Sequence, residues 1–349
     1  MLLIVLYNPQ KFRDDILKGN TLMAKQNSYT YKLTKEQQQT LILILQDGTF
    51  TKTEVPYTIY SVKGNDCSIN IYTSGKCLLQ GKGAEDFILF YLEPMVTQVA
   101  TLGYEDIINP EAMQPHCGVD ESGKGDLFGP LVVSAVYVDE TIVPTLREMG
   151  VKDSKNISSD AKALGLGKAL RRLLDGKFSI VKVGPEAYNR LYAKMRSVNT
   201  LLAWGHARSI ENILDLVPTC PKAISDQFGT KAQLEKALMK KGNTIELIQR
   251  HKAESDMAVA AASIIAREQF LLALKALEKT YDQEFPKGAS AKVKEMAIKL
   301  VEKNGPQVLE KTAKCHFKTT DQVLTAAGYK RSDLGEFGQA VSKPYTRRK

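Results

Sequence analysis

Two apolar runs flank a short charged loop near the middle of this 349-residue chain. The runs are HCGVD at 116–120 and LVVSAVYVD at 131–139, and both are rich in the β-branched residue valine. Runs of this length and composition are typical of buried β-strands. The short connection, with its glycines, suits a tight turn. The segment therefore predicts two neighbouring strands, and the rest of the domain has to be built around them.

Further strands and helices follow along the chain. KFSIVKVGP at 177–185 predicts a third early strand, and two more strands, KAISDQF and NTIELIQRHK, come later. Helical spacing of apolar residues marks 199–217, and a long alanine-rich helix is expected over 253–281. Early strands with short connections, followed by strands that alternate with helices, predict an α/β fold with one mixed five-stranded sheet flanked by helices.

The part of the chain before His116 has a different pattern. Residues 67–72 alternate like a half-buried strand, TSGK supplies a turn, residues 77–80 return, and GKGAEDFILFYLE opens a helix. We expect a small α+β domain here. Pro94, Pro110 and Pro115 mark a linker. The expected division is a leader at 1–22, a small amino-terminal domain at 23–93, a linker at 94–115, a larger second domain at 116–322 and a basic tail at 323–349.

The two ends carry their own expectations. MAKQNSYTYKLT, from Met23 on, looks like a translation start, so residues 1–22 are expected to lie outside the mature protein. SKPYTRRK at 342–349 holds four basic residues and no acidic one, and we expect it to be mobile and to attract phosphates without specificity. A chain from Met23 to about Ser332 should therefore fold and stay active.

Composition narrows the class of protein. No apolar run reaches the roughly 20 residues that span a bilayer, so we expect no membrane partner. Five scattered cysteines without a CxxC pair are read as reduced thiols of a cytoplasmic protein. The formal charge of +9, from 48 Lys and Arg against 39 Asp and Glu, suits a polyanionic partner. Nothing in the sequence implies a protein partner, and we expect a monomer.

Carboxylates stand at the ends of the predicted elements. Asp120 ends the first strand, Asp226 ends a later one, and Glu254 starts the long helix. If they converge at one edge of the sheet, their mutual repulsion requires a cation, and all-oxygen ligands favour Mg²⁺ or Mn²⁺. Glu121 follows Asp120 directly. Because neighbouring residues of a regular strand point to opposite faces, we expect the chain to leave strand geometry between them.

Plainer interpretations exist for each of these residues. An isolated Asp or Glu is often a solvated turn residue, and Glu254 also favours a helix N-terminus. The loop formed by Gly123, Lys124 and Gly125 can be a tight turn, although glycines also let a backbone approach a ligand. It does not satisfy the nucleotide-binding pattern GxxxxGK[ST].

Six segments then carry a family resemblance. GVDESGKGDLFGP, VKDSKNIS, AISDQFG, HKAESDMAVAAASIIAR, FPKGA and AKCHF occur in the order seen in the type 2 ribonucleases H. The chain resembles the bacterial ribonuclease HIII branch, and its SINIYTSGKCLLQGKGAEDF segment resembles the amino-terminal domain of that branch, which is similar to the TATA-binding protein fold.

The resemblance implies an endonuclease that hydrolyses the RNA strand of RNA–DNA hybrids with Mg²⁺ or Mn²⁺ and leaves 3′-hydroxyl and 5′-phosphate ends. It implies that Asp120, Glu121, Asp226 and Glu254 are catalytic and bind the metal. The glutamate at 254, where ribonuclease HII usually has aspartate, favours the HIII branch.

The resemblance also implies substrate contacts. The glycine loop is expected to contact the 2′-hydroxyls of the RNA strand. The remaining candidates for the substrate are Lys152, Ser154, Lys155 and Asn199. The first three also suit a polar loop, and Asn199 also suits a helix cap. Two other functions stay open at this point: cleavage at single ribonucleotides embedded in DNA, as in ribonuclease HII, and binding of nucleic acid without catalysis.

Overall fold

The computed structural model describes residues 27–64, 66–99, 110–151, 157–227, 229, 231–238, 242–250 and 253–341, with the backbone alone at Pro110, Glu111, Asn243 and Glu254. Most of the chain up to Ala112 forms one compact unit, and nearly all of the chain from Met113 on forms the other. The predicted leader at 1–22 and the last eight residues lie outside the described residues.

The first unit is a five-stranded antiparallel sheet with helices on one face. Its strands are β1 (Ser28–Lys32), β2 (Thr51–Lys52), β3 (Thr58–Lys63), β4 (Ser68–Tyr72) and β5 (Lys76–Gln80), in the order β1-β5-β4-β3-β2. The helices are α2 (Lys35–Asp47), α3 (Ala84–Phe87) and the π-helix η1 (Ile88–Thr97). The predicted hairpin is confirmed, since Ile69 pairs with Leu79.

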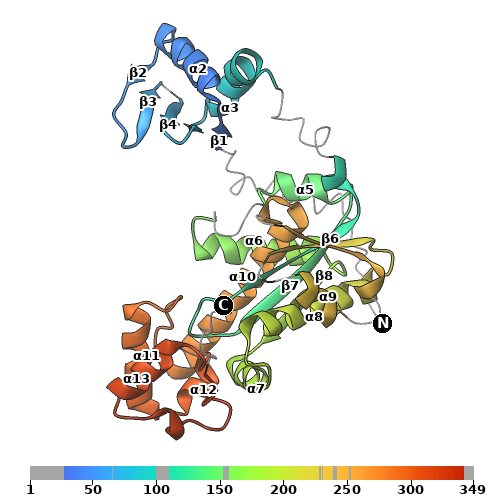
Figure 1. Ribbon diagram of the computed structural model, residues 1–349, viewed down its shortest axis with the longest axis vertical. Helices are drawn as coiled ribbons and strands as arrows, with labels where there is room; N and C mark the ends of the chain where they lie inside the picture. Colours follow the sequence, from blue (N-terminus) through green and yellow to red (C-terminus); the bar gives the residue numbers. More distant parts are fainter. Residues whose placement is uncertain are drawn as a thin grey trace, which may run out of the picture. The chain divides into compact units, whose positions relative to one another are not determined.

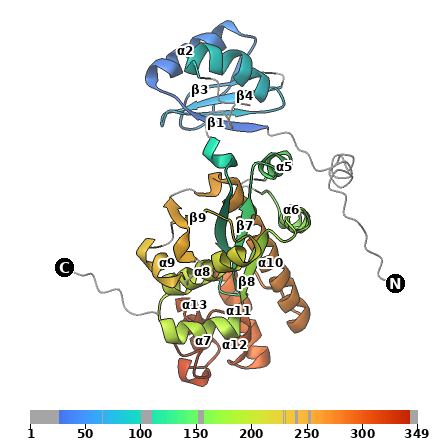
Figure 2. The same cartoon turned by 90° about the vertical axis from the view of Figure 1, so that its right-hand side faces the viewer.

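The helices bury one side of this sheet. Ile69, Ile71 and Leu79 point into a core with Leu41 of α2 and Leu92 of η1. Figure 2 shows α2 and α3 on the same side of the strands. The strand residues between the apolar ones, such as Asn70, therefore belong to the opposite face of the sheet.

The predicted start of the linker is wrong. Pro94 lies inside η1, which continues to Thr97, and Val96 is buried in the core of the first unit. Proline fixes its own φ and lacks an N–H group, but a wide helical turn tolerates both when the surrounding apolar residues pack. The residues that follow, up to Asn109, are largely outside the described part of the chain.

The second unit contains the predicted mixed five-stranded sheet. Its strands are β6 (His116–Ser122), β7 (Leu131–Val138), β8 (Phe178–Val183), β9 (Lys222–Asp226) and β10 (Glu246–Arg250), in the order β10-β9-β6-β7-β8. β6, β9 and β10 run parallel, whereas β7 is antiparallel to both of its neighbours. The α/β fold expected from the sequence is confirmed.

Helices cover both faces of this sheet (Figure 1). On one face, α8 (Val198–Leu216) and α9 (Lys231–Ala237) pack against Cys117 and Val119 of β6. On the other face lies α10 (Met257–Tyr281), beside α6 (Asp160–Leu173). The remaining helical segments before α10 are η2 (Pro110–Met113), α5 (Val143–Glu148), α7 (Pro185–Met195), η4 (Gly242–Thr244) and η5 (Ala253–Ser255).

Helix α10 is the one described helix that is long and apolar enough to cross a membrane. Within its most apolar window, 72% of the residues are buried inside the domain. Its alanines, from Ala258 to Ala262, are fully buried and pack against the central strands. The apolar character of α10 is therefore that of a core helix.

The carboxy-terminal helices form a further layer of the same unit. They are α11 (Ala291–Asn304), α12 (Val308–Thr312), α13 (Lys318–Ala326) and η6 (Arg331–Asp333). The expected tail at 323–349 is wrong in its first part, because Val323, Leu324 and Leu334 are buried in a core with Phe128 and Phe270. The packed domain continues to at least Ala340, which is buried beside Tyr188.

Candidate active site

Strand β6 presents its two carboxylates to opposite faces of the sheet. It stays paired with β7 in regular register as far as Ser122, opposite Val132. The expectation that the chain leaves strand geometry between Asp120 and Glu121 is therefore wrong. Asp120 shares the α10 side with Gly118, whereas Glu121 shares the α8 side with Val119.

Asp120 and Asp226 lie side by side on the α10 face. The parallel strands β6 and β9 pair Gly118 with Ile224 and Val119 with Ser225. One residue further, the same register brings Asp120 beside Asp226. Ile224, two residues before Asp226, packs against Val259 of α10, which identifies the face. The convergence predicted from the sequence thus holds for these two residues.

Glu254 approaches the same edge through its backbone. The turn η5, Ala253–Ser255, begins beside the end of β9, where the Ala253 N–H donates to Asp226 Oδ1 at 3.4 Å. The expectation that Glu254 starts the long helix is wrong, because α10 begins at Met257 with Asp256 as its N-cap. The acid instead sits in a separate 3₁₀ turn between Asp226 and the helix.

Glu121 is held by a buried histidine. His206 of α8 places Nε2 2.9 Å from Glu121 Oε2, and Lys124 Nζ lies 3.5 Å from Oε1. Burial raises the pKa of Glu121, but the hydrogen bonds and charges of these two partners outweigh it and leave the pKa below its ordinary value. Glu121 is therefore kept ionised on the far side of β6 from Asp120.

The glycine loop after β6 divides into two parts. Gly123 has φ +90°, and an added Cβ would lie 2.2 Å from the Pro130 carbonyl oxygen, so the fold itself requires glycine there. Apart from Gly125 and its two chain neighbours, no atom of the described residues lies within 4 Å of the place where a Gly125 Cβ would be. The packing of the domain accounts for Gly123, and it leaves open space beside Gly125.

The other predicted substrate residues have different outcomes. Lys152, Ser154 and Lys155 lie outside the described residues. Asn199 is exposed in the first turn of α8, but Ser197 caps that helix by accepting from the Thr200 N–H, so the helix-cap interpretation of Asn199 is wrong. Its Nδ2 lies 3.9 Å from the place of a Gly229 Cβ, close behind the end of β9.

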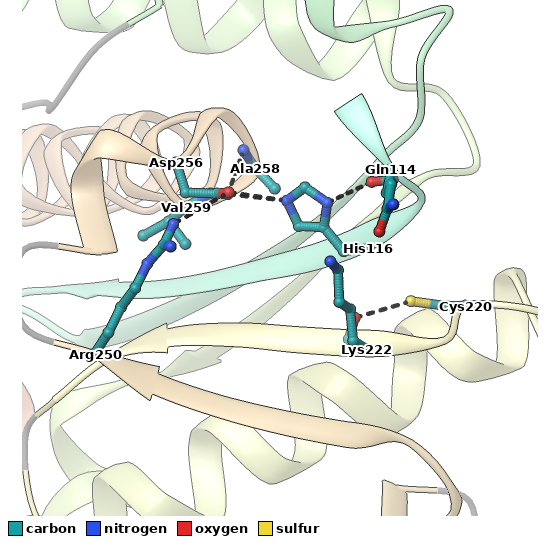
Figure 3. A network of polar contacts seen from close by, with 8 residues as sticks. All are labelled: Gln114, His116, Cys220, Lys222, Arg250, Asp256, Ala258 and Val259. Carbon is teal, nitrogen blue, oxygen red and sulfur yellow. Dashed lines mark hydrogen bonds and ion pairs between the residues drawn. The ribbon is translucent and has the colours of Figure 1, made fainter. Parts of the chain in front are cut away.

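Figure 3 shows a buried polar network that joins the start of β6 to the end of β10 and the start of α10. His116 Nε2 lies 3.1 and 3.0 Å from the two carboxylate oxygens of Asp256, and Nδ1 lies 2.6 Å from the Gln114 carbonyl oxygen. Arg250 reaches the same carboxylate at 3.5 Å. Burial lowers the pKa of His116, but Asp256 more than compensates, and the pKa ends above its ordinary value.

The donor set decides which metal fits. Among the side chains that the structure describes, no group of three or more His, Cys, Asp or Glu residues is arranged as a metal cage. Asp120 and Asp226 supply two carboxylates at one edge, and the turn that carries Glu254 adjoins Asp226. Oxygen ligands of this kind fit Mg²⁺ or Mn²⁺ rather than Zn²⁺.

Sequence reasoning missed His206, His116 and Asp256. Each is buried and contacts a charged group, and each comes from an element whose partner lies far away in the sequence. His206 stands within an apolar helical run, and a polar residue on that buried face was the available signal. The identity of its partner follows only from the packing of α8 on β6.

Known proteins share this architecture. The family model described as ribonuclease HII matches residues 117–320, and a model described as a domain of unknown function matches residues 28–100. Ribonuclease HIII of Chlamydia trachomatis serovar L2 is 43% identical over 80% of this chain and 92% of its own length. Ribonuclease HIII of Chlamydia pneumoniae is 39% identical over 85% of this chain and 98% of its own.

A solved structure agrees with these relatives. The crystal structure of Bst-RNase HIII in complex with Mn²⁺ is 28% identical, has a TM-score of 0.60, and covers 86% of this chain and 99% of that chain. The match extends over both units, so it includes the small amino-terminal sheet as well as the sheet that carries the acids. The chain therefore belongs to the ribonuclease HII family of type 2 ribonucleases H, and its relatives over nearly their whole length are ribonucleases HIII.

Proposed function

We propose that this chain is an endonuclease that hydrolyses the RNA strand of RNA–DNA hybrids with the help of Mg²⁺ or Mn²⁺. The observation that carries the proposal is the placement of Asp120 and Asp226 on the same face of two neighbouring parallel strands, next to the turn of Glu254. Two acids from distant parts of the sequence lie at one edge beside the turn that carries a third, and hydrolysis of a phosphodiester needs negative ligands for a cation there.

The metal would be held by Asp120, Asp226 and Glu254, with Glu121 as the fourth acid. When bound, a divalent cation stabilises charge on the phosphate and lowers the pKa of a water nucleophile. His206 keeps Glu121 ionised and fixed on the other face of β6. The reaction leaves a 3′-hydroxyl and a 5′-phosphate.

The open space beside Gly125 supports a role of this loop in contacting the RNA strand. A residue without a side chain lets the backbone N–H and C=O groups approach a ribose 2′-hydroxyl, which is the group that distinguishes RNA from DNA. Gly123 shapes the same turn. Lys124 pairs with Glu121, and we assign Lys152, Ser154, Lys155 and Asn199 to the phosphate backbone of the hybrid.

The small unit is the substrate-binding domain in this proposal. Its helices bury one face of the sheet, and the other face carries Lys32 and Lys76 on adjacent strands, with Tyr72 on the next. Basic and aromatic side chains on one face suit a nucleic acid backbone and exposed bases. We further propose that the enzyme acts in the cytoplasm as a monomer without a protein partner.

The test is a cleavage assay on defined substrates with Mg²⁺ or Mn²⁺. Three duplexes are compared: one with a continuous RNA strand, one with four ribonucleotides in DNA, and one with a single ribonucleotide. We expect cleavage of the first two and little of the third, and Asp226→Asn serves as the inactive control. Preferential cleavage at the single ribonucleotide would assign ribonuclease HII-like activity, and binding without cleavage would reject catalysis.

A further inference from the structure

The turn that carries Glu254 is fixed at both of its ends. At its start, the Ala253 N–H contacts the Asp226 carboxylate, and Ala253 itself is fully buried against Ile224 and Val259. At its end, Asp256 is only 5% exposed and is bound by His116. We propose that His116 and Asp256 are positioning residues that hold the turn η5 in place and thereby set where Glu254 meets the metal. The inference rests on the proposed role of Glu254.

Asp256 joins three structural elements through one carboxylate. Its Oδ1 accepts from the N–H groups of Ala258 and Val259, which caps α10. Both of its oxygens lie within 3.1 Å of His116 Nε2, from the first residue of β6. Arg250, at the end of β10, adds a contact at 3.5 Å (Figure 3). A shift of Asp256 would therefore move the helix start and the turn together.

The chemistry of His116 makes this contact an ion pair. Its Nδ1 faces the Gln114 carbonyl oxygen, and its Nε2 faces a carboxylate, so both ring nitrogens meet acceptors. A neutral imidazole carries one N–H only, whereas imidazolium carries two. The two acceptors thus favour the charged ring, and the raised pKa of His116 agrees with this assignment.

A helix cap alone does not explain such an arrangement. Capping needs one oxygen acceptor, which Ser, Thr or Asn also provides. Burial of the His116–Asp256 pair removes both charges from water, which costs free energy. We infer that the pair offsets this cost by holding the strand and the helix in one arrangement. Gly118, two residues after His116, brings β6 and α10 together so closely that an added Cβ would lie 2.2 Å from the Val259 nitrogen. The pair therefore acts where strand and helix touch.

The experiment measures Mn²⁺ binding to the full-length protein by isothermal titration calorimetry with manganese chloride alone. Asp256→Ala removes the cap and the ion pair, whereas His116→Leu removes the ion pair and the contact with Gln114 but leaves the cap. We expect each to weaken Mn²⁺ binding about tenfold, the lower end of the loss seen when groups behind a metal ligand are removed. Asp256→Asn keeps the Oδ1 acceptor that caps α10, and its amide N–H can donate to Nε2 of a neutral His116, so we expect its Mn²⁺ affinity to stay within about threefold of wild type.

Two controls separate positioning from general stability. Val323→Ala removes a buried side chain of α13, which contacts neither His116 nor Asp256 in the described hydrogen bonds and ion pairs, and should lower the thermal midpoint without changing Mn²⁺ affinity. In the double variant with His116→Leu and Asp256→Ala, the loss should equal that of Asp256→Ala alone, since the pair acts as a unit. The KM for an RNA–DNA hybrid should be unchanged in the single variants, while kcat falls.

The outcomes are distinct. Wild-type Mn²⁺ affinity in Asp256→Ala or in His116→Leu, with a thermal midpoint lowered as in Val323→Ala, would overturn the positioning role. So would a wild-type protein that binds no Mn²⁺. If the wild type binds Mn²⁺ but does not cleave hybrids, the proposed function fails, and the positioning pair is then decided by the Mn²⁺ affinities alone.

Discussion

His206 Nε2 lies 2.9 Å from Glu121 Oε2, in a contact that joins the middle of α8 to the end of β6. The histidine side chain is fully buried and that of the glutamate is 12% exposed. In such a site an ionised carboxylate needs a donor, and His206 provides it. Glu121 is thus held from the α8 face of the sheet, whereas Asp120 lies on the α10 face.

His206→Ala should therefore reduce both activity and stability. Removal of the donor leaves the Glu121 carboxylate buried with one partner fewer, which costs about 1–3 kcal/mol of unfolding free energy. We expect hybrid cleavage to fall about tenfold or more. His206→Gln keeps an N–H donor and should lose less of both. Urea unfolding and steady-state kinetics measure the two effects, and an unchanged turnover in His206→Ala would show that the contact is structural only.

The same pair predicts a pH dependence of stability. The folded pKa of Glu121 is lowered below its ordinary value of 4.5, so the contact stabilises the fold above pH 4.5 and is lost as the pH falls through the lowered value. The difference in unfolding free energy between wild type and His206→Ala should be largest above pH 4.5 and should shrink on further acidification. A difference that stays constant from pH 6 down to pH 3 would contradict this.

Charge removal at the acids should abolish activity without unfolding the protein. Asp120→Asn, Glu121→Gln, Asp226→Asn and Glu254→Gln are each expected to lower hybrid cleavage more than about a hundredfold, since direct ligands matter more than the groups behind them. Asp226→Asn should keep or raise the thermal midpoint of the metal-free protein, because it relieves repulsion with the neighbouring Asp120. Near-wild-type turnover at saturating Mg²⁺ would remove the residue concerned from the catalytic set.

Lys314 is a buried lysine that ties down the loop after Gly125. Its Nζ donates to the carbonyl oxygens of Asp126, Phe128 and Gly129, at 2.7, 3.2 and 2.8 Å. Burial lowers its pKa to about 7, against the opposing charge of Asp126. Lys314→Met leaves these carbonyl groups without their donor and should cost about 2–4 kcal/mol of stability. The loop should loosen, and the KM for the hybrid should rise.

The sign of the pH effect follows from the lowered pKa of Lys314. Between pH 7 and about 10 the unfolded chain binds more protons at this residue than the folded one, so stability gains about 1 kcal/mol per pH unit from it as the pH rises. Lys314→Met lacks this gain. Urea titrations at pH 7, 8 and 9 should therefore show a growing difference between the two proteins, and a difference that stays constant would mean that the folded lysine stays charged.

Removal of the small unit should affect binding more than chemistry. A chain that begins at Met113 keeps both core clusters around β6 and all four acids. We expect the KM for the hybrid to rise about tenfold or more at moderate salt, whereas kcat changes little. Equal KM values over a range of salt concentrations would show that the small sheet does not bind substrate.

Two truncations at the carboxy-terminal end of the chain should have different effects. A chain that ends at Val341 loses only the basic segment and should keep its thermal midpoint. A chain that ends at Ser332 loses Leu334, which is 3% exposed in the core, and should be destabilised by about 2–5 kcal/mol. Equal thermal midpoints for the two would restore the expectation that the tail begins before residue 332.

Local sequence patterns were sufficient to predict the fold class. They failed where tertiary packing determines the local structure. The valine-rich strands and the alanine-rich helix were predictable because their composition suits one element. The 3₁₀ turn before α10 was not, since Ala, Glu and Ser at 253–255 also suit a helix start. Likewise, Pro94 predicted the end of the small domain, although η1 continues through it.

The candidate site shows the same division. Asp120 and Asp226 could be brought together from the sequence because the ends of parallel strands meet at one edge. The partner of Glu121 could not be predicted, because its identity depends on which turn of α8 faces β6. Charged pairs between distant elements leave no periodic trace in the sequence, and they emerge only when the elements pack.

The contact between His116 and Asp256 spans 140 positions of the chain, and it has a consequence for folding. A growing polypeptide has Asp120 available early, but the turn of Glu254 can dock on β6 only after α10 has been made and packed. A nascent chain shorter than 254 residues lacks Glu254 and so cannot carry the complete set of acids. The site is therefore completed only after most of the second unit has been synthesised, and we expect nuclease activity to appear in a late step of folding.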